Sequence, residues 1–380
     1  MLWQKIDFSA FYETTKFEGC LKILLKSIIM LFEKKDQLIG LDIGSRSLKI
    51  AEIKKTKKNY KLNKFVMADI VSGSIEEGVI KKPKEIADSM RQLWSSYNIG
   101  LRNVAISVGS YSVIVKIINM PAMGEEQLQE SIQAEAEQYI PFDISDVYLD
   151  FQVLGENTNN SNQMNILLVA AKKEIVDNYI DLVQMAGLNP CIVDVDAFAL
   201  QNIYKINYET GNENIALIDI GASKISLNIL KDNSSIFIRD VALGSVQIDQ
   251  KIVSLLDCSL EKAEKIKLSG QSDEISSEDL RKVVSSVETE WCNEIKRAFD
   301  FFYSNYPDDE IAKIVLSGGG ANNKEFYKFL AEETSAKVET IDPFSSLYID
   351  EDRFDSSYLK KIAPQASVSL GLANRKVDDK

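Results

Sequence analysis

The most informative absence from this sequence is histidine, which does not occur once among its 380 residues. Catalysis by Ser-His-Asp or Cys-His groups and zinc binding by an HExxH helix all require histidine, so these classes of site are excluded. The GxxxxGK[ST] and GxGxxG patterns are absent as well. A P-loop nucleoside triphosphatase or a dinucleotide-binding domain would therefore lack its own signature here.

Cysteine and positive charge are also scarce. The four cysteines show no CxxC spacing, which is typical of buried thiols in a reducing compartment. Lys and Arg number 44 against 57 Asp and Glu, giving a net charge of −13. Because no basic excess is available to neutralise phosphates, nucleic acid is not expected as a partner. The length allows two or three domains with sizeable cores.

The apolar stretch at residues 19–32 is too short to span a bilayer and is interrupted by Lys22 and Lys26. Acidic residues precede it and no small-residue cleavage site follows, so it is a poor signal peptide. Two interpretations stay open. It is an interfacial amphipathic helix, or the residues before Met30 come from an upstream start. Residues 1–36 are therefore treated as an N-terminal extension.

What the sequence does contain is a strand–turn–strand pattern that occurs twice. Residues 38–50 read LIGLDIGSRSLKI and residues 215–227 read IALIDIGASKISL. In both, an apolar strand ends in Asp-Ile-Gly, a small residue follows, and a second apolar strand resumes. Such a turn directs backbone N–H groups and a hydroxyl at one point beside a carboxylate, which suits a phosphate chain with Mg²⁺. Taken singly, each copy is better explained by an ordinary hairpin.

A glycine triplet, Gly318-Gly319-Gly320, follows the apolar strand 314–317 and precedes a helical pattern at 323–330. Glycine lets the backbone approach a ligand closely, and a helix N-terminus favours an anion. Two such hairpins followed by a late glycine triplet resemble the actin, sugar-kinase and Hsp70 ATPase superfamily. The resemblance implies an α/β fold with a duplicated, ribonuclease H-like core around an ATP site.

The segment between the hairpins predicts a separate α+β unit at residues 104–190. Its expected elements are a long strand at 104–118, a helix at 125–139, a hairpin of 147–154 with 164–171, and a helix at 174–186. The unit carries no catalytic constellation, so a binding surface and a plain scaffold both remain open. The other expected units are a first core at 37–103 resuming at 191–211, a second core at 212–247, a helical region at 248–310, and a return to the second core at 311–380.

Three charged residues outside the hairpins are candidates for a nucleotide site. Asp196 follows the strand 191–195 where a helix begins, so its carboxylate either orients a water molecule towards a nucleotide or caps the helix. Because aspartate is one methylene shorter than glutamate, its reach to such a water is doubtful, and we expect slow ATP turnover. Glu264 and Lys267 are close enough on the predicted helix 261–268 to share one face.

Two linking motifs carry a closer resemblance. Residues 140–142 read IPF ahead of the strand 147–154, and residues 187–200 read GLNPCIVDVDAFAL. With the opening LIGLDIGS of residues 38–45, they resemble the PilM family of type IV pilus assembly proteins, which are cytoplasmic actin-like proteins related to FtsA, over residues 30–375.

This resemblance implies an inserted, SHS2-like subdomain that holds the cytoplasmic N-terminal peptide of a PilN-like inner-membrane protein. The protein would then be cytoplasmic and peripheral at the inner membrane, in contact with other pilus platform proteins and able to self-associate.

The resemblance also assigns roles to individual residues. It implies a first phosphate loop of Gly44, Ser45, Arg46 and Ser47, a second of Gly221, Ala222, Ser223 and Lys224, and Asp42 and Asp219 acting on Mg²⁺ through water. It further implies Gly244 and Ser245 near the phosphates or ribose, Glu264 and Lys267 near the nucleoside, and Gly318, Gly319 and Gly320 near the adenosine. Asp196 is the catalytic candidate. The family usually has two glycines where this chain has Gly244-Ser245.

A small-molecule or sugar kinase on the same core is the alternative function. A kinase needs a base beside the acceptor hydroxyl and a second small-molecule pocket. The sequence offers a peptide-sized insert and no substrate motif. An Hsp70-like chaperone would need an added substrate-binding domain, for which the chain is too short.

Overall fold

The computed structural model describes residues 37–56, 59–109, 112–157, 160–209, 211 and 213–376. The expectations for the N-terminal extension, residues 1–36, lie outside the described residues.

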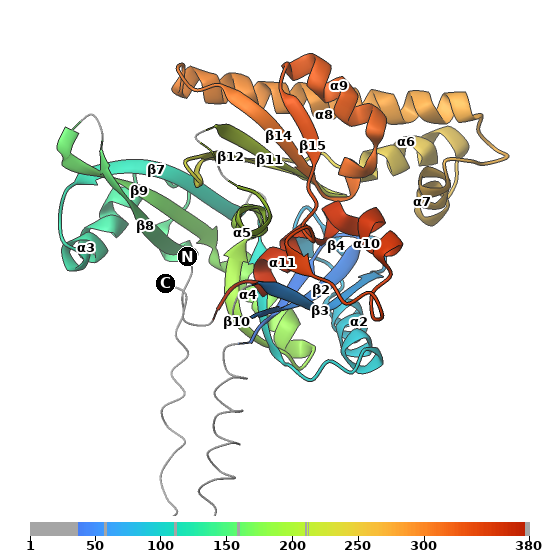
Figure 1. Cartoon of the computed structure of the whole chain (residues 1–380), viewed down its shortest axis with the longest axis horizontal. Helices are drawn as coiled ribbons and strands as arrows, with labels where there is room; N and C mark the ends of the chain where they lie inside the picture. Colours follow the sequence, from blue (N-terminus) through green and yellow to red (C-terminus); the bar gives the residue numbers. More distant parts are fainter. Residues whose placement is uncertain are drawn as a thin grey trace, which may run out of the picture.

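Two sheets of the same topology form the body of the protein (Figure 1). In the first, the order is β10-β6-β1-β2-β3-β16, and in the second it is β13-β12-β11-β14-β15. Strand β1 pairs antiparallel with β2 and parallel with β6, as β11 pairs antiparallel with β12 and parallel with β14. This repetition confirms the duplicated actin-like core predicted from the two hairpins.

The strands of the first sheet are β1 (Ile39–Ile43), β2 (Ser47–Lys55), β3 (Tyr60–Asp69), β6 (Asn103–Val108), β10 (Asn189–Val195) and β16 (Leu347–Tyr348). Those of the second are β11 (Asn214–Ile220), β12 (Ile225–Lys231), β13 (Ser234–Val241), β14 (Ile311–Ser317) and β15 (Lys337–Thr340). Central strands such as β11 are buried along most of their length, because helices cover both faces of each sheet.

Two helices, α5 (Asp196–Asn207) and α11 (Ser367–Ala373), lie between the sheets (Figure 1). Their apolar residues share one core with side chains from both sheets. The approach is close enough to require glycine. A Cβ on Gly371 would lie 1.8 Å from the Ala199 carbonyl oxygen, and one on Gly40 would lie 1.9 Å from the Ser369 carbonyl oxygen. Gly40, part of the first hairpin motif, therefore has a packing role.

The inserted unit is a three-stranded sheet in the order β7-β9-β8 with one helix on its face. It comprises β7 (Val113–Pro121), α3 (Glu125–Ala136), β8 (Val147–Asn157) and β9 (Asn160–Lys172). Leu128 and Ile132 of α3 are buried with Ile166 and Leu168 of β9. The expected hairpin is confirmed, with longer strands than predicted, and α3 ends before the expected residue 139.

The insert differs at both ends from the expected range of 104–190. The expected strand region 104–118 divides into two strands, because the chain leaves β6 of the first sheet at Gly109 and begins β7 of the insert at Val113. Strand β6 is buried along most of its length, whereas β7 is mostly half-buried or exposed. Helix α4 (Lys173–Met185) belongs to the first core, where Val176 and Leu182 pack with residues of α2 (Pro83–Ser96).

Helices occupy most of residues 248–310, where a helical region was predicted. The region contains α6 (Val246–Leu256), α7 (Leu260–Ser269) and α8 (Ser277–Asn305), and α9 (Lys324–Thr334) follows the glycine triplet. The Ser259 hydroxyl caps α7 by accepting a hydrogen bond from the Lys262 N–H at 3.3 Å. The apolar residues along one side of α8 are buried, including Trp291 and Phe302. The chain closes with α10 (Ser356–Ile362) before α11.

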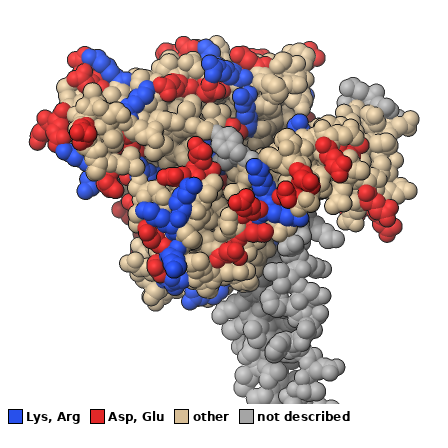
Figure 2. All heavy atoms as spheres, turned by 180° about the vertical axis from the view of Figure 1, so that it is seen from behind, with Lys and Arg blue, Asp and Glu red and all other residues tan. Residues whose placement is uncertain are grey.

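On the face shown in Figure 2, acidic and basic side chains are interspersed. Such mixing is typical of a solvated surface. Within the part of the chain that the structure describes, no helix is long and apolar enough to cross a bilayer.

Candidate functional site

The two predicted phosphate hairpins have the same local geometry and meet. In the first, the Gly44 N–H donates to the Ser47 carbonyl at 3.1 Å, and in the second the Gly221 N–H donates to the Lys224 carbonyl at 2.9 Å. The Ser45 hydroxyl donates to the Ser223 hydroxyl at 3.1 Å. The two loops therefore face each other across the two halves of the molecule.

The predicted Gly244-Ser245 pair lies against the second hairpin. The Ser245 N–H donates to the Gly221 carbonyl at 3.1 Å, and a Cβ on Gly244 would lie 2.4 Å from the Ala222 carbonyl oxygen. Glycine is thus required at 244, while serine is accommodated at 245, where the related family usually has a second glycine.

The glycine triplet also lies against the second hairpin. Gly318 has φ +83°, and a Cβ there would lie 2.4 Å from the Ile220 carbonyl oxygen. A Cβ on Gly320 would lie 2.3 Å from the Ile220 Cγ2. For Gly319 the nearest atom to such a Cβ is 4.0 Å away, on Gln365. Packing therefore explains Gly318 and Gly320, whereas Gly319 leaves backbone open to an approaching ligand.

The two hairpin carboxylates differ in their surroundings. Asp42 accepts a hydrogen bond from the Lys49 ammonium at 2.8 Å. Burial raises the pKa of Asp219 to about 6, against a hydrogen bond from Ser317, and repulsion by Asp42 adds to the rise. The main cause of the raised pKa is thus the burial of Asp219, and a cation bound beside it would favour the ionised carboxylate.

The donor set fits a water-mediated Mg²⁺. Among the described residues, no group of three or more acidic, cysteine or histidine side chains is arranged to hold a metal directly. Mg²⁺ usually keeps several waters and takes one or two carboxylates plus phosphate oxygens. Asp42 and Asp219 are the two carboxylates that such a site would use.

Asp196 lies in an ion-paired cluster. Its carboxylate accepts hydrogen bonds from the Lys224 ammonium and the Ser107 hydroxyl, each at 2.5 Å, and Lys224 is also 3.6 Å from Asp240. Asp196 is the first residue of α5, and the N-cap position is occupied by Val195. Burial alone would raise the pKa of Asp196, but Lys224 and Ser107 hold it below its ordinary value. Lys224 of the second half is thereby bound to the first.

The remaining predicted residues form a second charged cluster. Arg46 donates to Asp249 at 2.7 Å and to Glu264 at 2.9 Å, and Lys267 donates to Asp249 at 2.8 Å. Glu264 and Lys267 thus face the same cluster, as their spacing predicted. Arg46 extends from the first hairpin to helices α6 and α7.

Sequence reasoning missed several residues that complete these clusters: Lys49, Ser107, Gly109, Asp240 and Asp249. Lys49 lay inside the first motif, where its register opposite Asp42 could have been derived from the hairpin. Ser107 lies within the mostly apolar strand β6, and Gly109 follows the end of that strand. Asp249 reads in the sequence as an ordinary acidic residue in the first turn of a helix.

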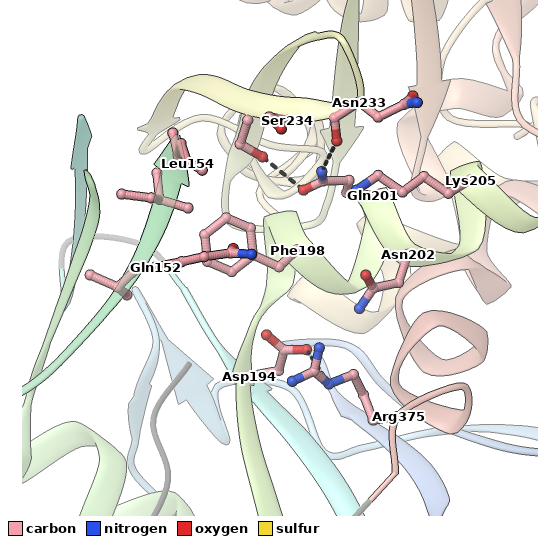
Figure 3. Close-up of a pocket in the computed structure, with 13 residues that line it drawn as sticks. Gln152, Leu154, Asp194, Phe198, Gln201, Asn202, Lys205, Asn233, Ser234 and Arg375 are labelled. Carbon is pink, nitrogen blue, oxygen red and sulfur yellow. Dashed lines mark hydrogen bonds and ion pairs between the residues drawn. The ribbon is translucent and has the colours of Figure 1, made fainter. Parts of the chain in front are cut away.

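A cavity of about 160 Å³ lies beside the insert (Figure 3). One wall is apolar, with Leu154, Leu167 and Val169 of the insert facing Phe198 of α5. The rest of the lining is polar and comes from β8, β10, α5, the start of β13 with the residue before it, and the segment after α11: Gln152, Asp194, Gln201, Asn202, Lys205, Asn233, Ser234, Ser235 and Arg375.

Polar groups in this cavity are buried and in part lack partners. The Nδ2 of Asn202 is buried without a hydrogen-bond partner. Asp194 is 5 % exposed and lies 3.4 Å from Arg375. Burial raises the pKa of Asp194, and Arg375 opposes the rise. The cavity therefore offers a free amide donor beside an apolar wall.

Comparisons with known proteins agree with this architecture. The family described as Type IV pilus assembly protein PilM matches residues 40–377. A solved "PilM-PilN type IV pilus biogenesis complex" aligns with a TM-score of 0.80 and 26 % identity over 91 % of this chain and 100 % of that chain.

Two further solved structures align with lower identity, and the first of them shares the fold. The ethanolamine utilization protein EutJ of Carboxydothermus hydrogenoformans aligns with a TM-score of 0.52 and 13 % identity over 93 % of this chain and 99 % of that chain. MreB 5 of Spiroplasma citri, solved bound to AMPPNP, has a TM-score of 0.47 and 14 % identity over 88 % of this chain and 94 % of that chain. With the family match spanning most of the chain, this actin-like protein belongs to the PilM family of type IV pilus assembly proteins.

Proposed function

We propose that this chain binds ATP with Mg²⁺ between its two phosphate hairpins and uses the nucleotide as a conformational switch in pilus assembly. The observation that carries the proposal is the hydrogen bond between Ser45 and Ser223, which brings the duplicated loops to one point. Two hydroxyls at facing glycine turns suit a polyphosphate, and Gly319 leaves room for the rest of the nucleotide.

Asp42 and Asp219 would hold Mg²⁺ through water, and the ion would neutralise phosphate charge when bound. The raised pKa of Asp219, about 6, supports this assignment because a cation beside this buried carboxylate would offset the cost of its burial. Lys49 and Lys224 are the nearby cations. Each is paired with an aspartate, Asp42 and Asp196 respectively, so each holds its position before any ligand enters.

Turnover is expected to be slow. Fast phosphoryl transfer to water requires a group that positions the nucleophile. The carboxylate of Asp196 is already bound by Lys224 and Ser107, and its lowered pKa makes it a weak base. A long-lived ATP state would keep one conformation populated while a partner docks.

Single-turnover measurements on the wild type and Asp196→Asn test this switch. We expect a wild-type rate below about 1 s⁻¹, the low end of ordinary enzyme rates. A faster rate would contradict the switch and favour the kinase alternative. A slow rate that is unchanged in Asp196→Asn would keep the switch and remove Asp196 from the mechanism.

The partner is expected to be the cytoplasmic N-terminal peptide of a PilN-like inner-membrane protein, bound at the insert. The insert would then be the SHS2-like subdomain of this family. The cavity in Figure 3 supports the proposal: Phe198 points towards Gln152 and Leu154 of the insert. A cavity of about 160 Å³ is near the size that accepts a benzene-sized group, so it fits one apolar side chain of a peptide.

The unpartnered Nδ2 of Asn202 would donate to a peptide carbonyl, because a buried donor without a partner is costly. Such a partner would also hold the protein at the cytoplasmic face of the inner membrane. Other platform proteins and further copies of this chain are expected contacts of the same assembly.

Fluorescence anisotropy with the labelled N-terminal peptide of the cognate PilN-like protein tests this site. We expect Leu154→Asp to weaken peptide binding at least about tenfold, because a charge would be buried against Phe198. Val153→Asp is the matched control, since Val153 is 48 % exposed and does not line the cavity. ATP affinity should be unchanged in both. Equal peptide affinity in the two variants would place the peptide elsewhere.

A further inference from the structure

Arg46 connects the first phosphate hairpin to the helices of the second half. Its guanidinium donates to Asp249 at 2.7 Å and to Glu264 at 2.9 Å. Asp249 lies on α6 and Glu264 on α7, and both helices are anchored in the second core through Ile252 and Ile266. A single side chain of one half is thus held by two carboxylates of the other.

The burial of Asp249 gives this contact its strength. The carboxylate is 0 % exposed and is compensated by Arg46 and by Lys267, which donates to it at 2.8 Å. A buried carboxylate that loses one of two cations is destabilised, because water cannot replace the lost charge. Separation of the two halves would leave Asp249 with Lys267 alone. The cluster therefore favours the closed arrangement.

The same cluster lies next to the meeting point of the hairpins. Arg46 follows Ser45, whose hydroxyl contacts Ser223. The guanidinium donates hydrogen bonds to Asp249, to Glu264 and, at 3.2 Å, to the Ser72 hydroxyl, so protein groups already take up its donors. Arg46 therefore acts on a ligand through the position of the two halves.

We propose that Arg46, Asp249 and Glu264 form a latch across the two halves, which must open before a nucleoside di- or triphosphate enters or leaves. The latch sets the rate of nucleotide exchange, and Arg46 and Asp249 are its positioning residues. This inference rests on the proposed nucleotide site. It adds what that proposal lacks, namely a physical reason for a long-lived bound state.

A latch and a ligand contact predict different kinetics. Because a nucleotide passes the same barrier in both directions, weakening the latch accelerates association and release together. Losing a direct contact to the nucleotide accelerates release and leaves association unchanged. The effects of substituting two residues of one latch on the rate constants are also not additive, because the first substitution already opens the latch.

Stopped-flow measurements with a fluorescent ATP analogue and Mg²⁺ provide the test, with release followed by displacement with excess unlabelled ATP. The variants are Arg46→Gln, Glu264→Gln and the double variant. Glu274→Gln is the control, because it breaks an exposed ion pair with Lys262 that lies within one half. We expect Arg46→Gln to raise both rate constants at least about tenfold, since it removes two charge-assisted hydrogen bonds. The double variant should be no faster than Arg46→Gln, and the control should match the wild type.

Unchanged rates in a folded Arg46→Gln protein would overturn the latch, and so would faster release with unchanged association. If the wild type binds no nucleotide, the proposed function fails, and the latch is then measured by hydrogen exchange in the nucleotide-free protein. Arg46→Gln should raise amide exchange around residues 44–47 and 246–250 relative to Glu274→Gln. Equal exchange in the two variants would end the inference. If Arg46→Gln does not fold, Glu264→Gln carries both measurements, because Glu264 is 29 % exposed.

Discussion

Gly109 lies where any side chain would collide with the Asp196–Lys224 pair. A Cβ there would be 2.2 Å from the Lys224 ammonium nitrogen and 2.5 Å from an Asp196 carboxylate oxygen. The flexible end of the Lys224 side chain can move away from a new Cβ at little cost to the stability of the fold. That movement would break its ion pair with Asp196. The residue that joins β6 to the insert is thus also part of the wall of the proposed nucleotide site.

Gly109→Ala should therefore weaken ATP binding about tenfold, the effect of losing roughly one charge-assisted interaction, while changing stability by less than about 1 kcal/mol. Calorimetry and thermal melting would measure the two effects. Gly100→Ala is the matched control, because a Cβ on Gly100 meets nothing within 4 Å. Normal ATP affinity in Gly109→Ala would show that the position of Lys224 is unimportant for binding.

Glu288 gives the stability of the fold a pH dependence. It is 5 % exposed on α8, and the Asn323 amide donates to it at the start of α9. Burial raises the pKa of Glu288 to about 7, which the hydrogen bond from Asn323 opposes. The folded-state pKa of Glu288 lies above the unfolded value, so the folded protein favours the protonated side chain. The stability that protonated Glu288 contributes is therefore fully present below about pH 4.5 and is lost as the pH rises through 7.

Glu288→Gln keeps this position neutral at every pH and preserves an acceptor for Asn323. We expect the variant to be more stable than the wild type at pH 8 by about 1–2 kcal/mol and equal to it at pH 5. Denaturant unfolding at the two pH values measures the difference. A variant no more stable than the wild type at pH 8 would contradict this account of Glu288.

At the scale of elements, the crossing of α5 and α11 holds the two halves together. A Cβ on Gly371 would lie 1.8 Å from the Ala199 carbonyl oxygen. Because the new Cβ would collide with a backbone atom, the clash can be relieved only if α5 or α11 shifts as a whole. Gly371→Ala should lower the free energy of unfolding by about 2 kcal/mol, although alanine is the better helix former. Denaturant unfolding checks the change against Gly100→Ala, and equal stability would show that the helices can separate freely.

Elements with strong periodicity could be predicted from the sequence. The hairpins, α8 and the cap of α7 at Ser259 follow from local patterns. The junction at Gly109 was missed although the sequence marks it, because Gly109, Ser110 and Ser112 interrupt the apolar pattern between β6 and β7. The placement of α4 in the first core could not be predicted, since its amphipathic face is the same whether it covers the insert or α2.

At the scale of the whole molecule, the duplication could be predicted from the sequence because each hairpin repeats the same short motif. The contacts that hold the two halves together could not be predicted. Arg46 and Asp249 lie 203 positions apart in the sequence, and neither residue type marks an ion pair by itself. Long-range pairing of charges depends on the final position of α6, which local pattern does not specify. The packing roles of Gly40 and Gly371 were hidden for the same reason.

The central claim is that ATP with Mg²⁺ binds where the two hairpins meet. Calorimetric titration of Mg-ATP into the wild type, Asp219→Ala and the surface control Asp300→Ala tests it most directly. We expect binding to the wild type and Asp300→Ala, and affinity at least about tenfold lower in Asp219→Ala, because a carboxylate on the metal side is lost. Equal affinity in Asp219→Ala, or no binding to the wild type, would contradict the account.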